Sequence, residues 1–309
     1  MRYILFFFIL VVAQSSFSQT DTLYFDPASG NYIIRYLGTT QSGQDTMVTL
    51  TYEPPTAIDP VIQGFVSPTA DGKYLYRYRI TNGTQAQQNL VEFSLHYDST
   101  VWIESRTPET SWRNYPRKMR DYSDTGKPKP TYTWVWRGDQ GLEATWFIDS
   151  CVVISDGLPT ITASYSQAKT RIWAWPAGGP NQKDTTASDI RMKLLRLEVY
   201  PNANVLRKTI GPKLPPTPFV PLSFLGTLIS YKHQAFDLGW IKNHGIATSL
   251  DQKLDNAKVQ LEKGNNTSAR NILEAFVNEV EALNKQDGQI TNEAYALLKF
   301  NTEYLIGKL

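Results

Sequence analysis

The chain contains one cysteine, Cys151, among 309 residues. A single thiol cannot form an internal disulfide, so the fold must depend on its hydrophobic core rather than on a covalent framework. Cys151 lies in the apolar run 147–154, which predicts a buried and unreactive thiol rather than a catalytic thiolate. Histidine is also scarce, with three residues that show no metal-ligand spacing, so we expect no metal and no cofactor.

Neither sign of charge is in excess, because 31 Lys and Arg stand against 29 Asp and Glu. A nucleic-acid-binding protein normally has a marked basic excess, so we expect no nucleic-acid partner. Hydrophobic residues at 41% and aromatic residues at 12% exclude a disordered chain. The nucleophile elbow of hydrolases, the phosphate-binding loop and the dinucleotide fingerprint are all absent from the sequence.

The N-terminus carries an apolar run at residues 4–12, which follows Arg2. Nine residues form about 14 Å of helix, whereas a membrane span needs roughly 20 residues. Small residues follow, including Ser16 and Ser18, as is typical of a signal-peptide cleavage site. We therefore predict that residues 1–18 are a secretory signal peptide and that the mature protein is secreted, extracellular or associated with the cell surface. No later apolar stretch is long enough to predict a membrane span.

Residues 19–211 have the pattern of short β-strands separated by turns. Over residues 73–80, tyrosine and isoleucine at every second position alternate with leucine and arginine, which is typical of a strand with one buried face. Asn82-Gly83 follows and predicts a hairpin turn. Many short strands without helical periodicity predict one antiparallel β-sandwich domain. The other expected strands span residues 32–37, 47–52, 131–137, 141–148, 160–166, 169–175 and 194–200.

A proline-rich linker is predicted at residues 212–224, because five of the ten residues from 212 to 221 are proline. Proline lacks the N–H donor that a sheet needs, so this segment is expected to be an extended spacer. Residues 225–309 then show apolar positions at steps of three and four, which predicts a small helical bundle. The predicted fold class is therefore mainly β plus α: an N-terminal antiparallel β-sandwich, a linker and a C-terminal bundle.

Several boundaries of the bundle helices can be predicted from capping residues. Gly264 is expected to end one helix, Thr267 or Ser268 to cap the next, and Thr291 to begin the last. A shorter helix is expected at residues 225–236.

The C-terminal segment also carries a recognisable arrangement of small and apolar residues. These are Gly245–Leu250, Lys253, Leu254, Ala257, Ala269, Leu273, Ala275–Val280, Ile290 and Thr291. With this spacing, residues 228–309 resemble the FIMAH domain, a small helical module of exported bacterial proteins. The resemblance implies an accessory or interaction role beside secreted hydrolases or adhesive modules, and it supplies no catalytic residues.

Two expected strands carry rows of large side chains on one face. One row is Tyr132, Trp134 and Trp136, and the other row contains Arg171 with Trp173 and Trp175. Aromatic rows on a sheet bind sugars, because the apolar face of a pyranose stacks on a ring. They also fill the cores of sandwiches, where alternate residues must be bulky. The sequence leaves both interpretations open.

Residues 106–130 are expected to form a long loop with seven Lys and Arg against three Asp and Glu, interleaved with aromatic residues. Long loops are uncommon unless they are functional or disordered. This loop could hold an acidic polysaccharide through guanidinium contacts and ring stacking, or it could be a solvated connection.

The sequence therefore predicts a secreted, non-catalytic interaction protein whose partner is an extracellular polysaccharide or a surface protein. Its candidate ligand-binding residues are Trp112, Arg117, Lys118, Trp134, Trp136, Arg171, Trp173 and Trp175. One alternative is a structural component of a surface or matrix, in which every large ring is buried. The other is a jelly-roll glycoside hydrolase or polysaccharide lyase, for which paired carboxylates would have to face each other roughly 5–9 Å apart.

Overall fold

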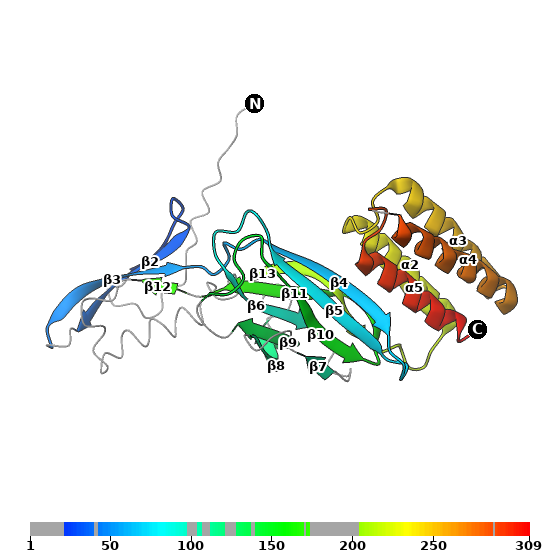
Figure 1. The fold of residues 1–309 in the computed structure, drawn as a ribbon, viewed down its shortest axis with the longest axis horizontal. Coiled ribbons are helices and arrows are strands. Elements are labelled where there is room, and N and C mark those ends of the chain that lie inside the picture. The colour runs from blue at the N-terminus through cyan, green and yellow to red at the C-terminus, as the bar shows by residue number, and fades with distance from the viewer. Residues whose placement is uncertain are drawn as a thin grey trace, which may run out of the picture. The chain divides into compact units, whose positions relative to one another are not determined.

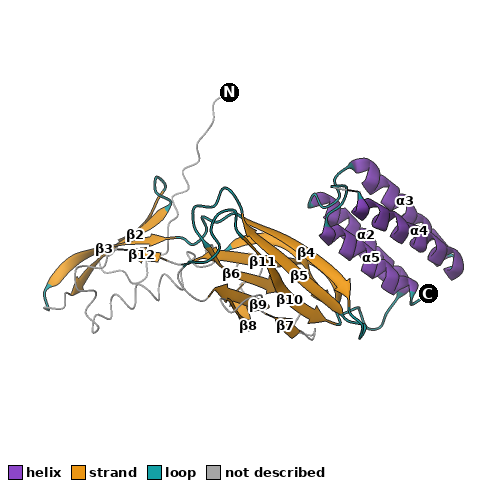
Figure 2. Ribbon diagram, in the orientation of Figure 1, coloured by secondary structure: helices purple, strands orange, loops and turns teal. Residues whose placement is uncertain are grey.

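The computed structural model describes residues 22–39, 43–97, 104–106, 112–120, 128–136, 140–169, 171–173, 204–286 and 288–309. The predicted signal peptide at residues 1–18 lies outside these ranges. Strands occupy the N-terminal part of the described chain and helices the C-terminal part (Figure 2), as predicted. The chain divides into two compact units. The first unit holds the described residues up to Pro54 together with one later strand, and the second unit holds the rest.

The first unit is a four-stranded antiparallel sheet. Its order is β1 (Thr22–Asp26), β2 (Asn31–Thr39), β3 (Asp45–Glu53) and β12 (Arg171–Trp173). Alternation along β2 and β3 buries Ile34 and Leu50 on one face and exposes Leu37 and Met47 on the other. The strands predicted at 32–37 and 47–52 are confirmed. The strand predicted at 194–200 lies outside the described residues.

The second unit contains two antiparallel sheets (Figure 1). One has the order β4 (Pro60–Pro68), β5 (Tyr74–Asn82), β10 (Phe147–Ser155) and β7 (Glu104–Arg106). The other has the order β13 (Val205–Lys213), β11 (Leu158–Ala168), β6 (Leu90–His96), β9 (Pro128–Trp136) and β8 (Trp112–Arg120). The predicted antiparallel β-sandwich is therefore confirmed for this unit. The prediction that residues 19–211 form a single domain was wrong, because the strands β1, β2, β3 and β12 belong to the first unit.

Aromatic side chains dominate the core of this sandwich. Phe93 and Trp134 stack with ring centroids 5.5 Å apart, and Tyr78 packs at 5.8 Å from Phe93. A buried phenol needs a hydrogen-bond acceptor, and each core tyrosine of β5 has one. Tyr76 donates to the carbonyl of Gly157 at 2.7 Å, and Tyr78 donates to the carbonyl of Ile210 at 2.9 Å. Burial raises the pKa of both phenols well above the ordinary value.

Two expectations about the sheets were wrong for the same physical reason. The expected loop at 106–130 contains β8, which pairs with β9, and the expected linker start at Pro212 lies inside β13. Both β8 and β13 end their sheet. A strand at the end of a sheet leaves one row of N–H groups without a strand partner, so it tolerates charged residues and prolines such as Pro116 and Pro212.

The strand expected at 141–148 is also displaced, because β10 begins only at Phe147. Gly141 and Thr145 have positive φ values of 74° and 72°, which interrupt extended backbone. Leu142 makes an isolated bridge to Leu90 between them. The chain therefore turns sharply just before it enters the sheet.

Four helices follow the strands, namely α2 (Pro221–Asp237), α3 (His244–Glu262), α4 (Asn266–Lys285) and α5 (Asn292–Ile306). Thr291 caps α5 as predicted, by accepting the N–H of Ala294. The cap of α4 is Asn265 rather than Thr267 or Ser268, because the Asn265 side chain accepts the N–H of Ser268. No helix in the described ranges is long and apolar enough to cross a membrane.

The bundle shares a hydrophobic core with the sandwich instead of standing apart behind a spacer. Leu158 and Ile210 of the sheet belong to the same buried cluster as Phe224 and Leu297 of the helices. The Asn301 amide of α5 also donates to the carbonyl of Pro159 at 2.8 Å. The bundle and the sandwich therefore form one packed unit, because helix α5 covers apolar surface of the sheets.

Candidate ligand-binding surface

The aromatic residues predicted to bind a ligand occupy the core where they are described. Trp112 is 1% exposed and Trp134 is 0% exposed, and Trp136 is partly buried with its ring 5.4 Å from that of Trp112. A buried indole cannot stack on a sugar from solvent, so Trp112 and Trp134 fill the sandwich. The core interpretation of the β9 row therefore holds for Trp134.

The structure does not describe the side chains of the other predicted residues. Arg117 and Lys118 lie on β8, and Arg171 and Trp173 lie on β12 of the first unit, but their side chains are outside the described part of the structure. Trp175 lies outside the described residues altogether.

A different surface is exposed on the outer face of the sheet formed by β4, β5 and β10. Cross-strand register places Gln63, Arg79 and Asp149 in one row and Phe65, Arg77 and Val152 in the next. The tyrosines of β5 point the other way, into the core. We call this surface the arginine face and define it by Val61, Gln63, Phe65, Arg77, Arg79, Trp146, Phe147 and Asp149.

Three charges in the arginine face hold one another in place. Arg77 donates to one carboxylate oxygen of Asp149 at 2.5 Å, and Arg79 donates to the other through Nη2 at 2.5 Å and Nε at 3.1 Å. The arginine side chains remain more than one third exposed. Such solvated pairs add little stability, but they fix the orientation of both guanidinium groups.

Aromatic rings support the guanidinium groups from the same sheet. The Arg77 guanidinium lies 4.5 Å from the ring centroid of Phe65, and that of Arg79 lies 4.9 Å from the ring centroid of Phe147. Cation–π contacts of this kind contribute about 0.5–1 kcal/mol at exposed sites. The arginine face is therefore organised before any ligand arrives.

The rings at its edge are open to solvent. Trp146 is 59% exposed and Phe147 is 56% exposed, although both are large and adjacent in the chain. Large aromatic rings that are more than half exposed are uncommon on a soluble protein and are candidates for a binding site.

The backbone that presents these rings adopts an unusual conformation. Thr145 has a φ of 72°, a left-handed value that β-branched residues rarely adopt. Its N–H donates to the carbonyl of Asn82 at 2.6 Å, and the N–H of Asn82 donates to the carbonyl of Trp146 at 3.0 Å. Strained backbone of this kind concentrates at functional sites.

A β-bulge explains why the sequence pattern did not reveal this surface. The register between β10 and β5 shifts between Asp149 and Cys151. The extra residue allows Phe147 and Asp149 to face solvent while Cys151 and Val153 enter the core. The alternation in residues 73–80 did predict that Arg77 and Arg79 lie on the face of the strand away from the tyrosines. This was the one feature of the sequence that indicated the arginine face.

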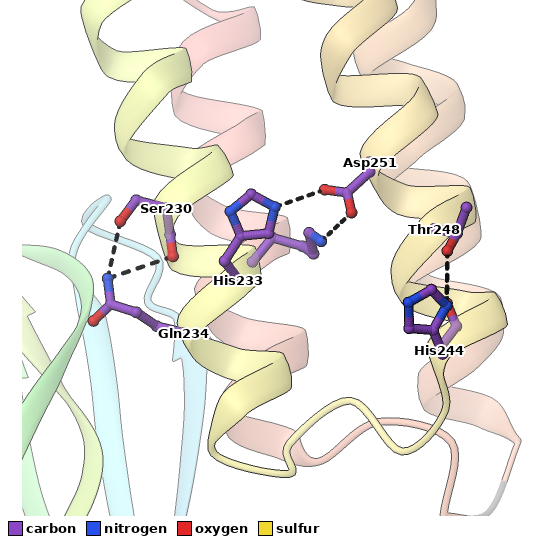
Figure 3. A network of polar contacts seen from close by, with 7 residues as sticks. Ser230, His233, Gln234, His244, Thr248 and Asp251 are labelled. Atoms are coloured by element: carbon purple, nitrogen blue, oxygen red, sulfur yellow. Dashed lines mark hydrogen bonds and ion pairs between the residues drawn. The ribbon is translucent and has the colours of Figure 1, made fainter.

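A second polar cluster lies between helices α2 and α3 (Figure 3). Lys232 is 2% exposed and pairs with Asp251, whose other carboxylate oxygen lies 3.1 Å from Nε2 of His233. On α3, the Thr248 hydroxyl lies 3.2 Å from Nδ1 of His244. Within the described ranges, no three His, Cys, Asp or Glu residues could hold a metal ion. The Lys232–Asp251 pair therefore serves as a link between two helices.

Comparison with known proteins agrees with the C-terminal resemblance. Residues 233–307 match the family model of the FIMAH domain, and the N-terminal region has no family assignment. No curated protein matches the chain. One matching solved structure is an uncharacterized protein from Nocardia farcinica with an immunoglobulin-like fold. It is 12% identical, with a TM-score of 0.26, over 40% of this chain and 93% of that one.

Proposed function

We propose that this protein, whose residues 233–307 form a FIMAH domain, is a secreted, non-catalytic interaction protein that binds a polysaccharide at its arginine face. The observation that carries the proposal is the exposure of Phe147, whose ring lies against the oriented guanidinium group of Arg79, with the exposed Trp146 next to it in the chain. An exposed ring offers a stacking surface to the apolar face of a pyranose, and guanidinium N–H groups can donate to sugar oxygens.

The position of Asp149 favours binding over acid–base chemistry. Each of its two oxygens already accepts a hydrogen bond from an arginine. A glycosidase acid or base needs an oxygen directed at the substrate or at a water. Asp149 is therefore suited to holding the arginines in place. We assign the helical bundle an accessory role in attachment or assembly, as its resemblance implies.

A polysaccharide panel tests the proposal. Affinity electrophoresis through gels that contain individual polysaccharides should retard the wild-type protein on at least one of them. Simultaneous Trp146→Ala and Phe147→Ala substitution should weaken that binding by about tenfold or more, because both stacking surfaces are lost. Tyr24→Ala is the matched control, since Tyr24 is an exposed aromatic residue of the first unit. Absence of retardation on every polysaccharide, or full binding by the double variant, would overturn the proposal.

A further inference from the structure

We infer that the polysaccharide bound at the arginine face contains hexuronic acid and that Arg77 and Arg79 bind its carboxylate. This inference rests on the proposed function and adds the charge and chemical class of the ligand.

The two arginines have more donors than Asp149 can accept. A guanidinium group carries five N–H donors. In the described part of the chain, Arg77 gives one donor to Asp149 and Arg79 gives two. Because both side chains are more than one third exposed, the guanidinium groups are in contact with solvent and can donate further hydrogen bonds to a ligand.

The charge of the cluster is also incompletely balanced. Two guanidinium groups face the single carboxylate of Asp149, which leaves one positive charge at the centre of the face. Glu104 of β7 is also acidic. It pairs with Ile154 of β10, which lies two cross-strand rows away from the row of Asp149. An anionic group is therefore favoured over a neutral one beside Arg79.

The geometry matches a planar carboxylate. Asp149 demonstrates that the two guanidinium groups converge on a planar group with two oxygens. Each oxygen of Asp149 is held by a different arginine, and a guanidinium edge can in addition bind both oxygens of a further carboxylate, which a lysine ammonium cannot do. A polymer of hexuronic acid repeats a carboxylate beside every pyranose ring, so one bound segment can contact an arginine and stack on Phe147 or Trp146.

The test compares free and esterified forms of the same polymer. The intact protein is titrated by calorimetry with polygalacturonate, alginate, methyl-esterified polygalacturonate, a neutral xylan and a sulfated glycan. We expect binding to polygalacturonate or alginate and at least tenfold weaker binding to the ester. The affinity should fall as salt is raised from 50 to 500 mM, because salt screens exposed charges.

Variants locate the effect at the arginines. Arg79→Gln should weaken uronate binding at least tenfold, and Arg79→Lys should fall between it and wild type because it keeps the charge but loses the fork. Arg35→Gln, at an exposed arginine on β2 of the first unit, is the matched control and should bind normally. Circular dichroism confirms that each variant is folded.

The possible outcomes separate the inference from the proposed function. Equal binding of acid and ester, or unchanged binding by Arg79→Gln, would overturn the inference. If the Trp146 and Phe147 double variant still lost affinity in that case, the proposed function would stand. Binding of the sulfated glycan without the uronates would refute the carboxylate assignment. Binding of no polymer at all would refute the proposed function itself.

Discussion

Glu293, in the first turn of helix α5, accepts a hydrogen bond from the backbone N–H of Gly64 at 2.5 Å, across 229 positions of the sequence. Gly64 lies in β4, which ends its sheet. A strand at the end of a sheet leaves N–H groups without a strand partner, and the buried carboxylate satisfies one of them. This bond joins the helical bundle to the sandwich.

Removal of the Glu293 acceptor should destabilise the second unit. Glu293→Ala leaves the N–H of Gly64 buried without a partner, which costs about 1–3 kcal/mol. Glu293→Gln keeps an oxygen acceptor and should lose far less. Urea unfolding of both variants at pH 7 measures the difference, and equal stability of the two would contradict this role for the Gly64 bond.

The ionisation of Glu293 should make stability depend on pH. Burial raises the pKa of Glu293, although hydrogen bonds from Gly64 and Thr291 oppose the shift. The folded state therefore holds the proton more tightly than the unfolded state does. This contribution to stability is complete below the ordinary glutamate pKa of about 4.3 and is lost as pH rises through the raised folded value.

Glu293→Gln cannot ionise, so it removes this contribution. The free energy of unfolding of Glu293→Gln relative to wild type should rise between pH 4 and pH 7. Urea titrations at several pH values provide the comparison. A constant difference across this range would show that Glu293 does not titrate with a raised pKa.

Gly64 should not tolerate a side chain. A Cβ added at Gly64 would lie 2.8 Å from Cγ1 of Ile210 and 3.1 Å from the Thr209 hydroxyl oxygen. Ile210 is fully buried, so Gly64→Ala should cost about 1–3 kcal/mol through overpacking. Gly226→Ala is the control, because Gly226 lies within α2 with open space around it and should gain about 0.5–1 kcal/mol. Thermal unfolding distinguishes these opposite signs.

The Lys232–Asp251 pair should respond unequally to loss of either partner. Asp251→Ala leaves the ammonium of Lys232 buried without its carboxylate, and we expect a loss of about 1–3 kcal/mol, the cost of an unsatisfied buried donor. Lys232→Met fills a similar volume and leaves Asp251 in contact with solvent and with His233. Its effect should stay within about 1 kcal/mol. Chemical unfolding of both variants measures the asymmetry, and a larger loss in Lys232→Met would be inconsistent with it.

Substitution of the buried Trp134 should lower stability, whereas substitution of the exposed Trp146 should leave stability nearly unchanged. Trp134→Ala opens a cavity in the aromatic core and should cost about 3–5 kcal/mol. Trp146→Ala changes a surface side chain, so stability should change by about 0.5 kcal/mol or less. It should also reduce the tryptophan fluorescence that acrylamide quenches, because Trp146 is 59% exposed. Strong destabilisation by Trp146→Ala would mean that this ring is a packing residue.

Much of the fold followed from local patterns. Alternation predicted β5 and its inward tyrosines, and spacing of three and four predicted the bundle, whose cap at Thr291 is confirmed. Prediction failed at β8 and β13, where charges and prolines suggested a loop and a linker. Such residues are tolerated when the strand lies at the edge of its sheet, and a local sequence pattern does not show whether a strand lies at the edge or in the middle.

The candidate site was harder to predict because its residues form no recognisable motif in the sequence and come together only in the folded chain. Arg79 and Asp149 come from different strands and meet only in the folded sheet. The bulge after Asp149 reverses the alternation that would otherwise have shown which side chains face solvent. Trp134 and Trp146 are equally aromatic in the sequence, yet one is enclosed and the other is open.

Local sequence patterns predicted most of the strands and helices and the apolar face of most of them, because these properties depend on neighbours within a few residues. What covers each of these faces could be read only from the folded chain. The folded chain buries Trp134 of β9 inside the sandwich, leaves the arginine face exposed and packs α5 against β4. These arrangements depend on packing and hydrogen bonding between residues far apart in the chain, such as Gly64 and Glu293.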